Sequence, residues 1–269
     1  MEIAIEDFCE DIVGKAMRGL KQSDNEVAAV AGVPAKSVEA IRKGRGTEAT
    51  VRAVAPQLNL DPDKLATSFL NQWRPQPHHV DGLFLSNTEY HDMRVNAYLI
   101  WDPNSRVGAI IDTGADASEL LDHAKAIGVI VTHIFLTHTH NDHILDLDHV
   151  RGAFSEASVH VGSREPLPGA HGVEPGDQFS VGNLNITARL TWGHSAGGVT
   201  YVIDGLAKPV AFVGDAVFAG SMGGGMVSYE DALRTNREEI LTLPDETILC
   251  PGHGPLTSVE EEKAHNPFF

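Results

Sequence analysis

The chain has 269 residues, 42% of them hydrophobic, and a formal net charge of −17 at pH 7. It is long enough to bury a large core, and no stretch approaches the roughly 18 apolar residues of a membrane helix, so we expect a globular, cytoplasmic protein. The two cysteines, Cys9 and Cys250, lie far apart in the sequence and have no C-x-x-C partner, so the sequence indicates neither a disulfide framework nor a cysteine zinc site.

The charge divides the chain into two segments. Residues 1–77 carry ten Lys/Arg and eleven Asp/Glu, whereas residues 78–269 carry ten and twenty-six. An acidic segment of this size repels nucleic-acid phosphates. Pro75 and Pro77 in "NQWRPQPHHVDG" separate helical from strand-like sequence and predict a domain boundary there.

The first segment, 1–77, is predicted to be helical. Ser23 and Glu26 form a capping box before the helix "DNEVAAVA", Gly32 ends it, and Pro34 suits the first turn of the next helix, "PAKSVEAIRKG". Further helices are expected in "TVRAVAPQLNL" and "PDKLATSFL". The residues expected to pack the first pair together are Val27, Val30, Val33, Val38 and Ile41.

Residues 20–70 resemble the helix-turn-helix domain of the lambda-repressor/Cro type, through "EVAAVAGVPAKSVEAIRKGRG" and "LNLDPDKLA". Arg42 departs from the acid usual in that family, and Pro56 interrupts a helix. The alternative is a small helical bundle used for packing or dimerisation. If "PAKSVEAIRKG" were a DNA-recognition helix, it would present Lys36, Ser37 and Glu39 to the bases. Arg42, Lys43 and Arg45 would then lie near phosphates.

That set is sparse for reading DNA, so DNA binding is possible but not favoured. We favour a role of residues 1–77 in assembly or docking, including a homodimer formed through this segment.

From residue 80 onward strands alternate with turns. "NAYLIWDP" and "VGAIIDTG", separated by "NSR", predict a hairpin, and "ASELLDHAKAIG" predicts a helix. The later predicted strands are "VIVTHIFL", "SVHVGS", "LNITARLTW", "VTYVIDG", "PVAFVGD" and "ETILCPGHG". This pattern predicts a mixed β core with helices outside it, and so an α/β fold.

The stretch "THTHNDH" follows one of these strands and places His138, His140, Asp142 and His143 within six positions. Three other strand-like segments are followed by side chains that bind metals: His194 in "TWGHSAGG", Asp215 in "FVGDAVFAG" and His253 in "LCPGHGP". Nitrogen and oxygen donors of this kind suit zinc, iron(II) or manganese. A carboxylate such as Asp215 can bridge two ions about 3.5–4 Å apart.

The order of these motifs resembles that of the metallo-β-lactamase fold superfamily over residues 80–269, and within it the glyoxalase II-like hydrolases. The resemblance implies an αββα sandwich, here preceded by a small all-α domain. It also implies one metal held by His138, His140 and His194, a second held by Asp142, His143 and His253, and Asp215 shared between them.

The implied activity is hydrolysis of a small thioester or related activated carbonyl by metal-bound hydroxide, with two divalent ions, most readily zinc, as cofactors. Asp142 is the candidate for orienting the hydroxide and receiving a proton. A thiolate leaves with little acid assistance, and the sulfur ligand of some lactamases is replaced here by Asp215, so lactamase activity is less favoured.

Two departures limit the substrate prediction. The chain ends at "EEKAHNPFF" without the helical domain that binds glutathione in glyoxalase II, and "ILDLD" replaces the usual glycine pair. The alternatives are a persulfide (sulfur) dioxygenase with one iron, and a DNA-binding regulator whose metal domain senses a ligand.

Several residues are given lesser roles. Asp112 is a candidate for orienting a metal ligand, Cys250 is expected in a buried strand, and "GGG" at 223–225 is expected to form a flexible loop near the cleft. A chain beginning near His78 is expected to keep its metals and activity. The histidines that match no motif are His123, His133, His149, His160, His171 and His265.

Overall fold

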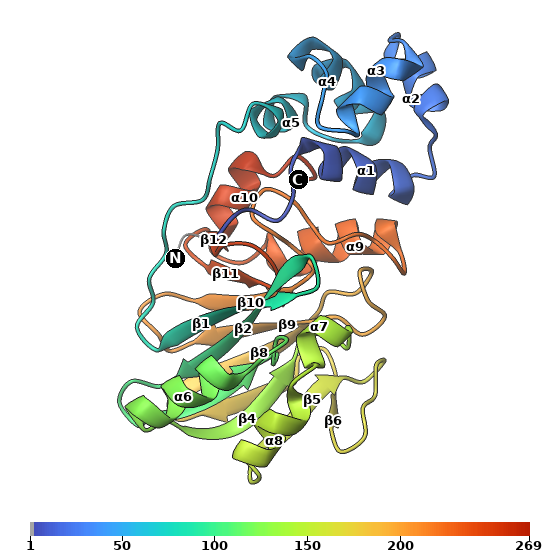
Figure 1. The fold of residues 1–269 in the computed structure, drawn as a ribbon. Coiled ribbons are helices and arrows are strands. Elements are labelled where there is room, and N and C mark those ends of the chain that lie inside the picture. The colour runs from blue at the N-terminus through green and yellow to red at the C-terminus, as the bar shows by residue number, and fades with distance from the viewer. Residues whose placement is uncertain (1–2) are drawn as a thin grey trace.

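A computed structural model describes residues 3–269 as helices followed by two sheets. Figure 1 shows the N-terminal helices as a separate layer above the sheets, next to α9 and α10. This layer consists of α1 (Cys9–Gly19), α2 (Asp24–Ala31), α3 (Ala35–Ile41), α4 (Glu48–Val54), the 3-10 turn η1 (Ala55–Leu58) and α5 (Pro62–Phe69). Within residues 3–269, no helix has both the length and the apolar character needed to cross a membrane.

The predicted helix signals in this layer are confirmed. Ser23 accepts a hydrogen bond from the Glu26 amide and Glu26 caps the Ser23 amide in return, so the capping box begins α2. Gly32 ends α2 in the left-handed conformation, with φ of 67°. The predicted packing of Val30 is wrong, because its side chain is 71% exposed. The buried residues of α2 are Val27 and Ala28, and Val30 lies on the opposite, solvent-facing side of the helix.

The first sheet has six strands in the order β1-β2-β3-β4-β5-β6. They are β1 (Leu83–Tyr90), β2 (Met93–Trp101), β3 (Val107–Ile111), β4 (Ile130–Leu136), β5 (Ser158–Gly162) and β6 (His171–Val173). The predicted hairpin is confirmed, since β2 and β3 pair antiparallel with Tyr98 opposite Ile111. Strands β3 to β6 then run parallel.

The second sheet has the order β12-β11-β10-β9-β8-β7. Its strands are β7 (Gln178–Val181), β8 (Leu184–Leu190), β9 (Val199–Asp204), β10 (Val210–Gly214), β11 (Ile248–Pro251) and β12 (Thr257–Ser258). The strands β10 and β11 are parallel, so their carboxyl ends, which lead to Asp215 and His253, lie at the same edge of the sheet.

The two sheets pack face to face with helices on both outer sides, which confirms the αββα sandwich. Phe135, Tyr201 and Phe212 are fully buried between the sheets. The helices of the first outer layer are α6 (Ser118–Ile127), α7 (Asn141–Ile144) and α8 (Leu147–Ala153), and those of the second are α9 (Tyr229–Thr235), the π-helical turn η2 (Asn236–Ile240) and α10 (Val259–His265). Separate apolar clusters bury α6 and α8 against the first sheet, and η2 and α10 against the second.

The N-terminal helices share a hydrophobic core with the sandwich. One cluster contains Ile12, Val13 and Met17 of α1 together with Met222, Tyr229 and Phe268 of the second segment. Polar contacts cross the same boundary: the Asp61 amide donates to the Pro267 carbonyl at 2.9 Å, and Lys64 Nζ donates to the Phe269 carbonyl at 2.6 Å. The boundary at residue 77 in the sequence is therefore not a boundary between independent cores.

Three of the histidines without a motif stack across the first sheet. The rings of His133 and His160 lie 5.4 Å apart, and those of His160 and His171 lie 5.6 Å apart, beside Phe135 and Phe179. Burial lowers the pKa of His160 from 6.5 to about 4, and His133 adds to the effect. The folded state therefore resists protonation of this imidazole, while the unfolded chain does not.

We expect this cluster to weaken the fold in mild acid. Because the pKa of His160 is lower in the folded state, stability is constant above the unfolded value of 6.5 and falls as the pH drops toward about 4. His160→Phe should reduce that loss by on the order of 2 kcal/mol. Urea unfolding at several pH values measures how much the free energy of unfolding falls with pH, and His79→Phe, at an exposed histidine, is the control. Equal acid sensitivity in the wild type and His160→Phe would contradict the assignment.

Candidate metal centre

Seven side chains predicted from the sequence converge at one edge of the sandwich. Two groups of candidate ligand atoms, each within 4.8 Å of one another, contain the following residues: His138, His140, His194 and Asp215 in one, and Asp142, His143 and His253 in the other. They come from the carboxyl ends of β4, β10 and β11, from the loop after β8, and from α7. Strands that end at the same edge of a sheet bring these distant segments together.

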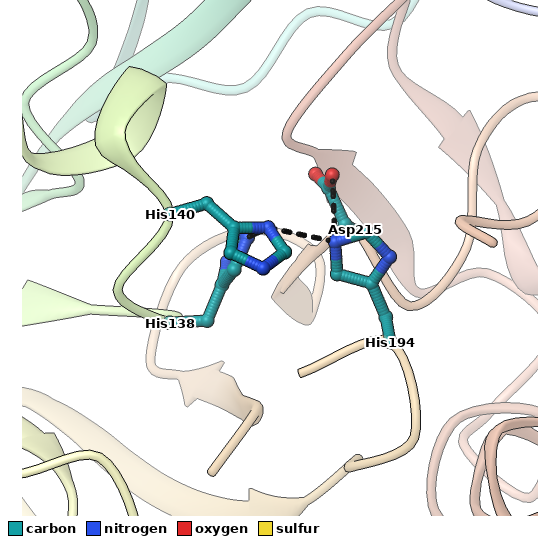
Figure 2. Close-up of side chains that lie close together, drawn as sticks. All are labelled: His138, His140, His194 and Asp215. Carbon is teal, nitrogen blue, oxygen red and sulfur yellow. Dashed lines mark hydrogen bonds and ion pairs between the residues drawn. The ribbon is translucent and has the colours of Figure 1, made fainter. Parts of the chain in front are cut away.

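The first group is compact. His140 Nδ1 lies 3.0 Å from both His138 Nε2 and His194 Nε2. Asp215 Oδ2 lies 3.3 Å from His194 Nε2 and so completes a four-membered donor set (Figure 2). Three nitrogens and one oxygen match the donor set and number that zinc prefers.

The second group lies on the other side of Asp215. Asp142 Oδ2 is 3.2 Å from His253 Nε2 and 3.6 Å from His143 Nε2. Asp215 Oδ1 is 3.3 Å from His143 Nε2, whereas its Oδ2 faces both His194 and His253. Asp215 is thus placed between the two groups, as a shared ligand requires.

The protonation of the imidazoles follows from their outer partners. His194 Nδ1 donates to the Gly224 carbonyl at 2.9 Å, and His253 Nδ1 donates to the Arg94 carbonyl at 2.6 Å, because a carbonyl can only accept. His143 Nδ1 lies 2.8 Å from Asp112 Oδ2. Each of these rings therefore directs the lone pair of its Nε2 atom into the centre when it is neutral.

This donor set fits divalent metal ions. His143 Nε2 and Asp215 Oδ1 are buried without a hydrogen-bond partner within the part of the chain that the structure describes. A buried polar atom without a partner is costly, and several lone pairs directed at one another repel. A cation bound between these atoms would give each a partner and remove the repulsion between their lone pairs.

Without a cation the centre attracts protons instead. Burial opposes the charging of His143 and of His253, but the surrounding carboxylates together outweigh it and raise their pKa values to about 10 and about 11. Asp215 and Asp112 act on His143, and Asp215 and Asp142 act on His253. Burial likewise opposes ionisation of Asp215, yet His253 and His143 hold the pKa of this carboxyl well below its ordinary value. The Asp215 carboxylate therefore requires positive charge beside it, from protonated histidines or from a bound cation.

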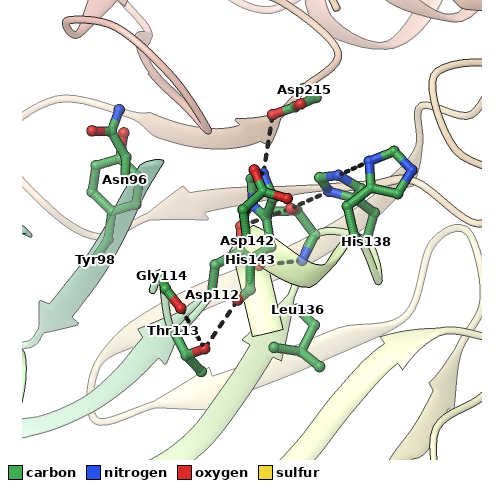
Figure 3. Close-up of polar contacts among 12 residues, drawn as sticks. Asn96, Tyr98, Asp112, Thr113, Gly114, Leu136, His138, Asp142, His143 and Asp215 are labelled. Carbon is green, nitrogen blue, oxygen red and sulfur yellow. Dashed lines mark hydrogen bonds and ion pairs between the residues drawn. The ribbon is translucent and has the colours of Figure 1, made fainter. Parts of the chain in front are cut away.

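Asp112 positions the second group, as the sequence suggested. Figure 3 shows its carboxylate beneath His143. The Thr137 amide donates to Asp112 Oδ1 at 2.8 Å and the Thr137 hydroxyl to Oδ2 at 2.7 Å, which fixes the carboxylate. The backbone of Asp112 has a φ of 55°, an uncommon value for a residue other than glycine.

A second set of buried polar groups fixes the loop that carries His253. Asn96 Nδ2 donates to the carbonyls of Pro251 at 2.9 Å and of Gly254 at 2.8 Å. The Tyr98 hydroxyl donates to the same Pro251 carbonyl at 2.6 Å. Figure 3 shows the side chains of Asn96 and Tyr98 next to each other. These contacts connect the two sheets directly behind the centre.

Glycines allow the backbone to approach the ligands. A Cβ atom at Gly252 would lie 2.2 Å from Asp215 Oδ1 and 2.5 Å from His143 Cε1. A Cβ atom at Gly223 would lie 2.0 Å from the Asp215 carbonyl oxygen. The stretch 223–225 therefore packs on the centre, and its Gly224 carbonyl orients His194. Any side chain at Gly252 or Gly223 would displace a ligand.

A cavity of about 560 Å³ opens over the centre, and the N-terminal segment forms one of its walls. His194, Asp215 and His253 line it from the sandwich, and Glu6, Lys15 and Arg18 line it from the N-terminal segment. These last three residues could not be predicted from the sequence, because no local pattern links them to strand ends far away in the chain. The cavity can admit a small molecule to the ligands.

The comparison with known families agrees with this geometry. The sequence model of the metallo-beta-lactamase superfamily matches residues 92–253, which include all seven converging side chains. The chain belongs to the metallo-beta-lactamase superfamily. Helices α1–α5 precede the matched residues.

Relatives of this superfamily include hydrolases and metal-bound structures. A probable metallo-hydrolase of Streptococcus pyogenes is 32% identical over 193 residues, which are 62% of this chain and 82% of that protein. The hydroxyacylglutathione hydrolase of Haemophilus influenzae is 27% identical over 210 residues, which are 65% of this chain and 92% of that protein. The crystal structure of TTHA1623 in a di-iron-bound form has a TM-score of 0.58 at 26% identity and covers 69% of this chain and 100% of that one.

Proposed function

We propose that the chain is a binuclear metallohydrolase that cleaves a small thioester. The observation that carries the proposal is the pair of donor groups on either side of Asp215, open to one cavity. Bound divalent metals would polarise the substrate carbonyl and lower the pKa of water to about 7. The similarity to a hydroxyacylglutathione hydrolase supports the thioester class.

The chain's own residues would divide the remaining work. His138, His140 and His194 hold one position, and Asp142, His143 and His253 hold the other. Burial alone would raise the pKa of Asp142, but its hydrogen bond with His253 and the charge of His143 outweigh this and lower it. Asp142 is therefore ionised at neutral pH and able to orient a water molecule and accept its proton.

Hydrolysis of a thioester panel by the metal-loaded protein tests the activity, with a β-lactam for comparison. A thiolate is a good leaving group that needs little protonation, whereas an amine must be protonated as it leaves. We expect turnover of thioesters and little of the lactam. A protein loaded with metal that cleaves no thioester would contradict the proposal.

We expect two divalent metal ions per chain. The reason is the second donor group, Asp142 with His143 and His253, which a single-metal site would not need. Elemental analysis combined with an anomalous-scattering map measures the number, the identity and the ligands of the ions. One ion at full loading, with His253 uncoordinated, would contradict the binuclear centre and favour the one-iron persulfide dioxygenase instead.

The helix-turn-helix-like segment is proposed to support the active site rather than to bind DNA. Two of the three cations expected near phosphates are already paired, Arg42 with Asp24 at 2.9 Å and Lys43 with Glu39 at 2.6 Å. The shared core and the cavity wall give this segment a role within the enzyme. Nanomolar, sequence-selective DNA binding at physiological salt, lost on changing Lys36 and Arg45, would contradict this proposal.

A further inference from the structure

The cavity over the metal centre has cationic side chains on one wall only. Lys15 and Arg18 of α1 are its two lining residues with a permanent positive charge, and both come from the N-terminal segment. We propose that Arg18 binds a carboxylate on the thiol portion of the substrate. This inference rests on the proposed thioester hydrolysis and names the chemistry of the leaving thiol.

The ammonium group of Lys15 already has hydrogen-bonding partners within the protein. Its ammonium group pairs with Asp7, and it donates to the Met222 carbonyl at 2.9 Å. The Ser221 hydroxyl also donates to Asp7, at 2.6 Å. Lys15 therefore attaches α1 to the sandwich, and its charge is compensated.

The Arg18 guanidinium, in contrast, has no partner among the described residues. Within residues 3–269 its guanidinium makes no hydrogen bond or ion pair. It lies over the backbone of α1, since a Cβ atom at Gly14 would be 3.2 Å from Arg18 Nη1. A guanidinium with free N–H groups, held beside a cavity, suits the two oxygens of a carboxylate.

The backbone at Arg18 is fixed by the packing of its neighbour. Gly19 lies directly against Tyr229 of α9, where a Cβ atom would be 2.2 Å from the ring. This close approach holds the carboxyl end of α1 above the cavity. The backbone of Arg18 is thus held by a rigid element, and its exposed side chain can turn toward a ligand in the cavity.

The acidic surroundings of the cavity oppose an anionic ligand, so binding of an anion here depends on a local cation. The chain has a net charge of −17, which repels anions at long range. Glu6 and Asp7 line the same cavity, and Lys15 forms its ion pair with Asp7. An anionic thioester therefore needs a local cation besides the metals, and Arg18 is the uncompensated one on this wall.

The test uses S-lactoylglutathione and its dimethyl ester, which share the scissile bond and differ in the charge of the thiol portion. We expect the metal-loaded wild type to prefer the acid by about tenfold or more in kcat/KM, mainly through KM. Arg18→Gln should remove most of this preference and Arg18→Lys should keep part of it. Arg45→Gln, an exposed arginine of the same segment, should leave the preference unchanged. No preference in the wild type, or an unchanged preference in Arg18→Gln, would overturn the proposal.

A binding measurement separates this inference from the proposed function. S-methylglutathione is a thioether without a scissile thioester, and calorimetry measures its affinity for the metal-loaded protein directly. We expect Arg18→Gln to weaken binding about tenfold and Arg45→Gln to have no effect. If neither thioester is cleaved but this difference is found, the proposed function fails and the anion site stands. Absence of binding, or equal affinity in wild type and Arg18→Gln, overturns the anion site.

Discussion

Replacing Asp142 with alanine is expected to lower thioester hydrolysis by about a thousandfold or more while leaving the fold intact. The side chain is a candidate ligand of the second metal position and the candidate proton acceptor, so a single change removes both functions. Its carboxylate lies 3.2 Å from His253 Nε2 and is ionised at neutral pH. Its neighbour His143 is held independently by Asp112, so the loop should keep its conformation.

The measurement combines kcat with metal content and circular dichroism for each variant. Asp148→Ala is the matched control, because this carboxylate is fully exposed on the following helix, α8. It should retain wild-type turnover and metal content. Near-normal turnover by a correctly metallated Asp142→Ala protein would show that this residue is not the proton acceptor.

The metal centre could be predicted from the sequence because its signals are local. Most candidate ligands lie within a few residues of the end of a strand, as His138 follows β4 and Asp215 follows β10, and the others lie on α7 in the same short motif as His138. In an α/β fold the ends of such strands meet at one edge, so the order of the motifs indicates the three-dimensional cluster. The same locality made the capping box of Ser23 and the turn at Gly32 predictable.

The contribution of the N-terminal segment could not be predicted in the same way. Arg18 reaches the cavity through the packing of α1 against α9, where Gly19 meets Tyr229, far away in the chain. Glu6 precedes α1 and lies beside Gly254. Composition also gave a misleading signal, since the change in charge at residue 77 coincides with a proline-rich linker but not with the edge of a core. Short strands such as β6 and β12 have too few residues to show alternation.

A chain beginning near His78 is expected to lose its stable fold and with it the activity, in contrast to what the linker at residue 77 suggested. The deletion would expose Met222, Tyr229 and Phe268, which are buried against α1 and its neighbours. Exposing each costs about 2 kcal/mol, and the sum is comparable with the ~5–15 kcal/mol that stabilises a typical domain.

A point substitution tests the same interface without removing residues. Phe268→Ala should lower the free energy of unfolding by about 3–5 kcal/mol, because its ring is 2% exposed within the shared core. Val30→Ala, which truncates a side chain that is 71% exposed, should change it by less than about 0.5 kcal/mol. Urea unfolding of the full chain gives both values, and thermal melting with metal analysis gives the outcome for the deletion. The prediction for the deletion would be contradicted if the shortened chain still melts cooperatively, binds its metals and turns over substrate. That result would show that the sandwich is complete without the N-terminal helices, although α1 forms a wall of the cavity.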